Sequence, residues 1–152
     1  MDMENRRQAA ENTFKTLLCM GCVPIVNEND AVSTDELGQF GGNDILSAYV
    51  ARLCSADLLV NLSDIDGLYD SDPRKNPNAR LVDRVDNIED YVECAGGAGA
   101  DCGTGGMQAK LTAARMVTDI GIPMFIMNGE NPEILYDLLD GKHVGTYFSA
   151  RK

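Results

Sequence analysis

The chain has 152 residues, 44% of them hydrophobic, which is the size and composition of one ordinary globular domain. Its 13 basic residues stand against 24 acidic residues, so the formal net charge is −11 at pH 7, and such a surface repels nucleic acids and anionic membranes. No apolar run approaches the roughly 20 residues that are needed to span a bilayer.

The N-terminal part predicts a helix followed by a strand. Apolar residues at helical spacing indicate a helix from Met3 to Gly21, and the short apolar run Cys22–Val26 predicts a buried strand, placed near an edge by Pro24. The polar N-terminus lacks an apolar leader, which predicts a cytoplasmic protein. Cys19 and Cys22 have C-x-x-C spacing, but one histidine and no second such pair favour reduced thiols over zinc, with a redox pair as the alternative.

A polar cluster follows the predicted strand. Asn27, Glu28, Asn29 and Asp30 lie where the strands of an open α/β sheet end, and such sheets bind ligands there. Asn and Asp also favour turns, so a turn is the alternative. Two amides and two carboxylates suit an amine or another polar substrate.

The next predicted element is a helix from Asp44 to about Ala56. Asn43 is a favourable N-cap for it, and Asp44 suits the positive end of the helix dipole. Helical spacing places four apolar residues on its buried face: Leu46, Tyr49, Val50 and Leu53. Capping alone accounts for both polar residues, so a purely structural role stays open for them.

A second buried strand is predicted over Asp57–Leu62. It ends in Ser63 and Asp64, again at a carboxyl end. Residues 65–80 read as turn-rich and polar loops, and residues 82–88 as a short strand or an irregular segment.

The glycine-rich stretch Ala95–Gly106 precedes a predicted helix, Met107–Ile120. Glycine lets backbone N–H groups turn toward a ligand, and a helix N-terminus adds unpaired donors and about half a positive charge. With Lys110 one turn inside the helix, the stretch predicts an anion cradle, most often for phosphate. A flexible loop with a surface lysine is the alternative, because neither the Walker A nor the G-x-G-x-x-G spacing is present.

The remaining pattern completes an alternation of helices and strands. Ile122–Met127 predicts a third strand, Pro132–Leu139 a helix capped by Asn131, and Val144–Phe148 a last strand. The alternation predicts an α/β fold, a three-layer αβα sandwich with a mainly parallel sheet, formed by residues 1–152 as a single domain.

Several motifs in fixed order carry a family resemblance. They are Asn27–Asp30, Phe40–Asp44, Ser63–Tyr69 with Asp72–Arg74, and Gly103–Lys110. From about Phe14 to Phe148 the chain resembles the amino-acid kinase family. Aspartate, uridylate and acetylglutamate kinases share the Ser63–Tyr69 run with Asp72–Arg74 in variants, whereas the other three motifs are similar to those of the glutamate 5-kinases.

The resemblance implies transfer of the γ-phosphoryl group of ATP, with Mg²⁺, to the side-chain carboxylate of L-glutamate, which opens proline biosynthesis. The implied glutamate-binding residues are Asn29, Asp30 and Asn43. The implied nucleotide-binding residues are Ser63, Asp64, Thr104, Gly105, Gly106, Met107 and Lys110. Asp44 and Lys110 would be catalytic, Asp44 by aligning lysines and Lys110 by stabilising the charge on the transferring group. No residue is assigned to a metal.

The chemistry suits these residues. Phosphoryl transfer needs positioning and charge neutralisation more than covalent help, and a carboxylate nucleophile is already ionised near pH 7. Two positions depart from the family pattern: Gly42 stands where Asp is usual, and Ala109 stands where Thr is usual. Each removes a polar group from the implied site.

The resemblance implies that the chain begins midway through the family fold. We therefore expect the nucleotide-binding, C-terminal part of a kinase domain, with low or no activity alone and with the N-terminal half as a partner. Apolar sheet edges favour self-association, which predicts a homo-oligomer. The alternatives are a non-catalytic nucleotide-binding or regulatory module, and a related acetylglutamate, aspartate or uridylate kinase.

Overall fold

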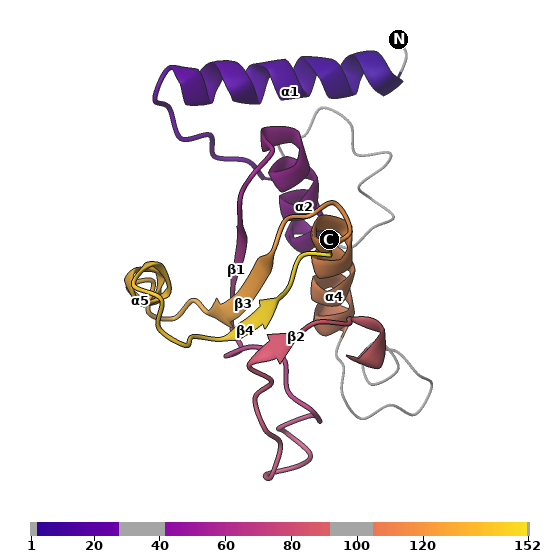
Figure 1. Ribbon diagram of the computed structural model, residues 1–152, viewed down its shortest axis with the longest axis vertical. Helices are drawn as coiled ribbons and strands as arrows, with labels where there is room; N and C mark the ends of the chain where they lie inside the picture. Colours follow the sequence, from indigo (N-terminus) through magenta and orange to yellow (C-terminus); the bar gives the residue numbers. More distant parts are fainter. Residues whose placement is uncertain (1–2, 28–41, 92–104, 152) are drawn as a thin grey trace.

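The computed structural model describes residues 3–27, 42–91 and 105–151 (Figure 1). The helices are α1 (Met3–Cys19), α2 (Asn43–Cys54), α4 (Gly105–Thr118) and α5 (Ile134–Leu139). The strands are β1 (Leu59–Ser63), β2 (Arg84–Val85), β3 (Met124–Asn128) and β4 (Thr146–Phe148). All the helices in these ranges are too short or too polar to cross a membrane.

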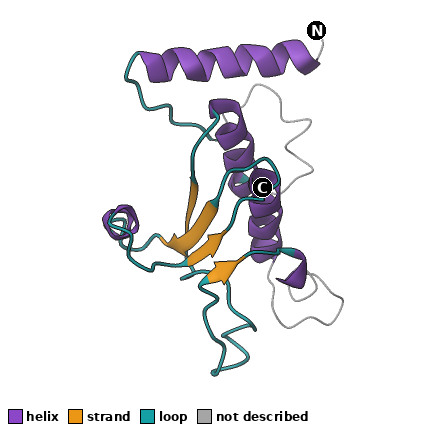
Figure 2. Ribbon diagram, in the orientation of Figure 1, coloured by secondary structure: helices purple, strands orange, loops and turns teal. Residues whose placement is uncertain are grey.

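The four strands form one sheet in the order β1-β3-β4-β2. β1 runs parallel to β3, and β2 runs parallel to β4, while β3 and β4 are antiparallel. Helices α2 and α4 contact each other and the sheet, and α5 lies on the other side of the sheet (Figure 2). The predicted α/β architecture with a mainly parallel sheet is therefore confirmed.

The core lies between the sheet and the two packed helices. Leu111, Ala114 and Val117 of α4 are at most 1% exposed, which confirms the predicted buried face of that helix. On α2, however, Tyr49 is 40% exposed, so the predicted face is partly wrong. The buried residues of α2 are Ile45, Leu46, Ala48 and Ala51. The small alanine side chains let α2 and α4 approach closely, and this packing decides which side of α2 is buried.

The start of α2 differs from the prediction. Gly42, not Asn43, is the N-cap residue, and its carbonyl oxygen accepts the N–H groups of Ile45 at 3.2 Å and Leu46 at 3.3 Å. The φ of Gly42 is +85°, a conformation that glycine adopts without strain. With Gly42 as the cap, the helix begins at Asn43. The prediction, with Asn43 as the cap, places the start one residue later, at Asp44.

The strand predicted over Cys22–Val26 is wrong. These residues form no regular element, and Val23 and Ile25 are 86% and 97% exposed. A strand needs a neighbour to pair its backbone groups, and none of the strands in the described residues pairs with this segment. Pro24 and Val26 instead line an apolar groove beside α2.

The other elements match their predictions with shifted ends. β4 lies inside the predicted strand, and β1 and β3 overlap the predicted strands and end one residue later. β2 falls within the segment read as a short strand or an irregular segment. α4 begins two residues earlier than predicted, at Gly105, so Gly105 and Gly106 belong to its first turn. The Asn131 side chain accepts the N–H of Glu133 at 3.1 Å, as a cap does, although α5 itself starts at Ile134.

Candidate active site

Three elements bring their polar side chains to one point. Asp44 at the start of α2 receives the ammonium of Lys110 from α4, with 3.0 Å between Oδ2 and Nζ. The other carboxylate oxygen, Oδ1, accepts a hydrogen bond of 2.6 Å from Nδ2 of Asn61 in β1. The Lys110 and Asp44 side chains are 13% and 21% exposed, so the ion pair is largely shielded from water.

Local structure explains why these groups meet. Asp44 lies in the first turn of α2, where the helix dipole favours a carboxylate. Lys110 follows the first turn of α4, and the close packing of α2 against α4 brings the two side chains together. Asn61 occupies the middle of β1 and, by the two-residue period of a strand, shares its face with Leu59 and Ser63.

A cavity of about 380 Å³ opens beside Lys110. One wall is the first part of α4 and the other is the loop that follows β1. The lining residues are Asp64, Ile65, Gly67, Leu68, Tyr69, Ser71, Asp72, Pro73, Arg74, Gly106, Met107 and Lys110. The cavity therefore lies at the carboxyl end of a parallel strand and against a helix N-terminus, where unpaired N–H donors favour an anion.

Most of the predicted site residues that the structure describes lie in or next to this cavity. Asp64, Gly106, Met107 and Lys110 line this one cavity, and Asp44 holds the lysine. Ser63 does not line it, but the Ser63 hydroxyl donates a 3.0 Å hydrogen bond to Asp64.

Other predicted residues lie elsewhere. Asn43 lines the apolar groove next to α1, and Gly105 is in the first turn of α4 but outside the cavity lining. Asn29, Asp30 and Thr104 lie outside the described residues.

The loop that walls the cavity is anchored to the sheet. The N–H of Leu68 donates to the buried hydroxyl of Thr146 in β4 at 2.8 Å, and the Leu68 carbonyl accepts the N–H of Val82 at 2.8 Å. Further along, Asp72 Oδ1 accepts the backbone N–H of Arg74 at 3.0 Å. That hydrogen bond, followed by those of the Arg74 guanidinium, holds the pKa of Asp72 below its usual value. These hydrogen bonds tie the wall of the cavity to the sheet and hold the turn around Asp72.

Sequence reasoning missed Asn61 and Thr146. Each acts across a long stretch of chain, since Asn61 bonds Asp44 and Thr146 bonds the backbone of Leu68. The one local signal for Asn61 is an amide in the middle of an otherwise apolar strand, Leu58-Leu59-Val60-Asn61-Leu62. The hydroxyl of Thr146 has no comparable signal, because threonine is common in strands.

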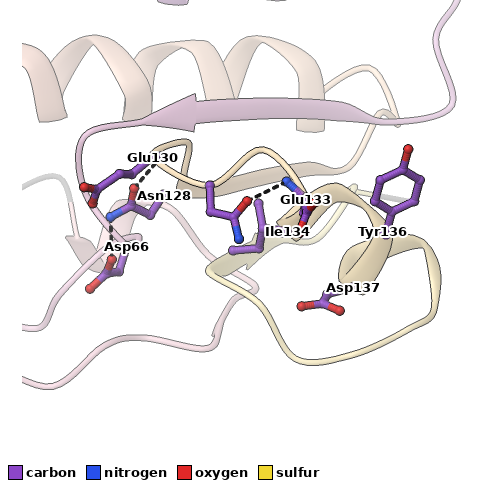
Figure 3. A pocket seen from close by; sticks show the side chains of 8 residues that line it. Asp66, Asn128, Glu130, Glu133, Ile134, Tyr136 and Asp137 are labelled. Atoms are coloured by element: carbon purple, nitrogen blue, oxygen red, sulfur yellow. Dashed lines mark hydrogen bonds between the residues drawn. The ribbon is translucent and has the colours of Figure 1, made fainter.

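A second cavity, of about 580 Å³, lies at the carboxyl ends of β1 and β3 (Figure 3). Its lining residues are Asp66, Asn128, Glu130, Asn131, Glu133, Ile134, Tyr136 and Asp137. The Asn128 side chain spans its rim, donating to Asp66 at 2.8 Å and accepting the N–H of Glu130 at 2.9 Å. None of these described lining residues is basic and four are acidic, so this cavity repels a polyphosphate although it is the larger one.

The comparisons with known proteins point in one direction. A model of the amino acid kinase family matches residues 2–128. A glutamate 5-kinase from Clostridium perfringens is 54% identical over an alignment that covers 99% of this chain and 58% of that protein. A glutamate 5-kinase from Streptococcus agalactiae is 50% identical, with coverage of 95% and 56%. The chain therefore spans less than three fifths of the length of these curated relatives.

Solved structures support the same fold. A UMP kinase from Ureaplasma parvum superimposes with a TM-score of 0.60 at 20% identity, covering 91% of this chain and 52% of that one. A UMP kinase from Bacillus anthracis gives a TM-score of 0.55 at 24% identity, covering 74% and 42%. At these identities the likeness concerns the fold alone.

Proposed function

Because this chain belongs to the amino acid kinase family, we propose that it forms the nucleotide-binding part of an enzyme that phosphorylates the side-chain carboxylate of L-glutamate. The observation that carries the proposal is the ion pair of Lys110 with Asp44 beside a cavity that also contains Asp64 and the start of α4. The high identity to glutamate 5-kinases supports glutamate as the acceptor.

The cavity provides what a triphosphate needs. The N–H groups of the first turn of α4 and the ammonium of Lys110 are donors for phosphate oxygens. The Lys110 ammonium has three donors, and within residues 3–27, 42–91 and 105–151 only Asp44 takes one of them, so two can face a ligand. Divalent magnesium in such sites is bound by one or two carboxylates and the substrate phosphates. Of the two lining carboxylates, Asp72 accepts hydrogen bonds from Arg74, so Asp64 is the one that would fit this role. Bound Mg²⁺ would neutralise charge on the phosphates.

The proposed mechanism is one of positioning and charge stabilisation. The glutamate carboxylate attacks as an anion, so no general base is required. Lys110 stabilises the charge on the transferring phosphoryl group, and Asp44 holds the ammonium in place. A preoriented charge of this kind in a shielded site is worth more than in water, because no reorganisation is needed during the reaction.

The proposed glutamate site consists of three polar residues. Asn29, Asp30 and Asn43 are its proposed ligands, and Asn43 lies directly before Asp44 at the start of α2. The departure at Gly42 has a structural counterpart, because the positive φ of this residue is favourable for glycine and strained for aspartate. The second departure, Ala109, lies on α4 beside Lys110.

We also propose that this chain works with further polypeptide. Its curated relatives are substantially longer, and apolar residues stay exposed on α1 and on the segment after it: Leu18, Met20, Val23 and Ile25. Either the remaining part of a kinase domain or a second copy of the chain in a homo-oligomer covers such a surface.

The proposal predicts selective chemistry. With Mg-ATP, we expect glutamate to be phosphorylated, with release of ADP, and hydroxylamine to trap the acyl phosphate as glutamyl hydroxamate. We expect no ADP release above background with N-acetylglutamate, aspartate or UMP. The rate should be low for the chain alone and should rise when the remaining residues of the Clostridium perfringens relative are added as a separate polypeptide.

Each other outcome has a distinct meaning. Phosphorylation of UMP or aspartate in place of glutamate would identify a different kinase of the family. Calorimetric heat from Mg-ATP with no product in any mixture would favour the second candidate, a non-catalytic nucleotide-binding module, which the departure at Gly42 also favours.

A further inference from the structure

Asn61 is out of place in its strand. Asparagine is depleted in strands, yet Asn61 lies in the middle of β1, opposite Ile126 of β3, and is only 9% exposed. A buried amide without a partner costs about 1–3 kcal/mol, whereas an apolar residue at this position would add core packing. A buried amide at this position therefore requires a hydrogen-bond partner.

The partner is the carboxylate of Asp44. Nδ2 of Asn61 donates to Oδ1 of Asp44 at 2.6 Å, which is short for an N–H···O bond and fits a charged acceptor. The second oxygen of the same carboxylate faces Nζ of Lys110 at 3.0 Å. One carboxylate therefore bridges an amide donor on β1 and an ammonium on α4.

We propose that Asn61 is a positioning residue for phosphoryl transfer, and the proposal depends on the function argued above. By holding one oxygen of Asp44, the amide fixes rotation of the carboxylate about its Cβ–Cγ bond. The other oxygen is then directed at Lys110, whose ammonium lies at the cavity. β1 is the rigid element in this chain of contacts, because its backbone is paired with β3 along its whole length, from Leu59 to Ser63.

β1 also connects Asn61 to the residues that we propose bind the nucleotide. The chain passes from Asn61 through Leu62 directly to Ser63 and Asp64, which follow at the carboxyl end of β1. A single strand thus places the support for Lys110 and the proposed nucleotide residues in a fixed relation.

Two near-isosteric substitutions separate positioning from packing. Asn61→Leu removes the donor and adds an apolar side chain to a buried strand, so we expect an unchanged or higher melting temperature. We nevertheless expect kcat, measured after addition of the remaining residues of the Clostridium perfringens relative, to fall about tenfold with little change in KM for glutamate. The reason is that Lys110 is less well oriented. Asn61→Asp places a second carboxylate against Asp44, and kcat should fall further, by about 100-fold.

The matched control is Val60→Thr. Val60 precedes Asn61 in β1, and its side chain points to the opposite face of the sheet, so the same strand is altered without contact to Asp44. We expect kcat within about twofold of the parent chain for this variant, since no group of the three-residue contact is changed.

Nuclear magnetic resonance gives a readout that does not require activity. In the unmodified chain, one side-chain amide proton of Asn61 should resonate downfield and exchange slowly with solvent, and Asp44→Leu should reverse both properties. In Asn61→Leu, the ammonium resonance of Lys110 should move toward that of a solvated lysine. The proposed function would be refuted if no substrate were phosphorylated even after the remaining residues of the Clostridium perfringens relative were added. The resonances of Asn61 and Lys110 would still test the contact with Asp44 in that case.

Two results would overturn the inference. The first is an Asn61→Leu variant with the parent kcat and an unmoved Lys110 resonance. The second, which needs no variant to fold, is an unmodified chain in which both Asn61 amide protons exchange rapidly at ordinary positions.

Discussion

Substituting methionine for Lys110 should slow phosphoryl transfer by about 10²–10³-fold, the loss typical of removing one preoriented charge from a transition state. Methionine keeps an unbranched side chain of similar length, so packing along α4 is preserved. Asp44 retains the hydrogen bond from Asn61 and some contact with water, and we therefore expect the free energy of unfolding to fall by only about 1–2 kcal/mol. Hydroxamate formation, with the remaining residues of the Clostridium perfringens relative added as a separate polypeptide, measures the rate. Thermal denaturation measures the stability.

The control for this substitution is Lys142→Met. Lys142 is also paired with a carboxylate, Asp137, at 2.5 Å, but its side chain is 60% exposed and Asp137 lines the acidic second cavity. This variant should keep the parent rate. Equal losses in both variants, or a Lys110→Met loss below about threefold, would show that the ammonium at the proposed site does not act in the reaction.

A second large effect is expected in the turn before β4. Gly145 has a φ of +63°, and a Cβ there would overlap the carbonyl oxygen of Ile126 and come within 2.8 Å of Cβ of Met127. Gly145→Ala therefore combines a strained backbone with overpacking, each of which costs about 1–3 kcal/mol. We expect a total near 4 kcal/mol and a fall in melting temperature of roughly 12 °C.

Gly141→Ala is the matched control for that substitution. Gly141 has a similar φ of +77°, but nothing lies within 4 Å of the position of its Cβ. The cost should be the backbone strain alone, about 1 kcal/mol. If both alanine variants melted at the same temperature, that result would contradict the close contact between β3 and the turn at Gly145.

Local pattern in the sequence was sufficient where structure is decided locally. The buried face of α4, with Leu111 and Val117, follows from helical spacing, and the strands β1 and β3 follow from their apolar runs. Cys22–Val26 shows the limit, because an apolar run becomes a strand only beside another strand. The start of α2 shows a second limit. Asn43 is a favourable N-cap residue by its side chain, but the observed N-cap is Gly42, whose positive φ cannot be read from the sequence pattern.

The candidate site was predictable in part for the same reason. Motif resemblance selected Lys110, Asp44 and Asp64, and the structure brings all three to one region. It did not select Asn61 or Thr146, because their contacts depend on how β1, α2 and β4 are placed in three dimensions. Such partners become visible only when the elements are assembled.

Binding of ATP with paramagnetic Mn²⁺ in place of Mg²⁺ tests the account most directly, because the ion broadens resonances of the nuclei nearest to it. The backbone amide signals of Asp64, Gly106 and Met107 should broaden first, and Lys110→Met should weaken the effect. Signals of Tyr136 and Asp137 in the acidic cavity should stay sharp. Broadening that begins at Tyr136 and Asp137, or is absent at the start of α4, would contradict a nucleotide site beside Lys110.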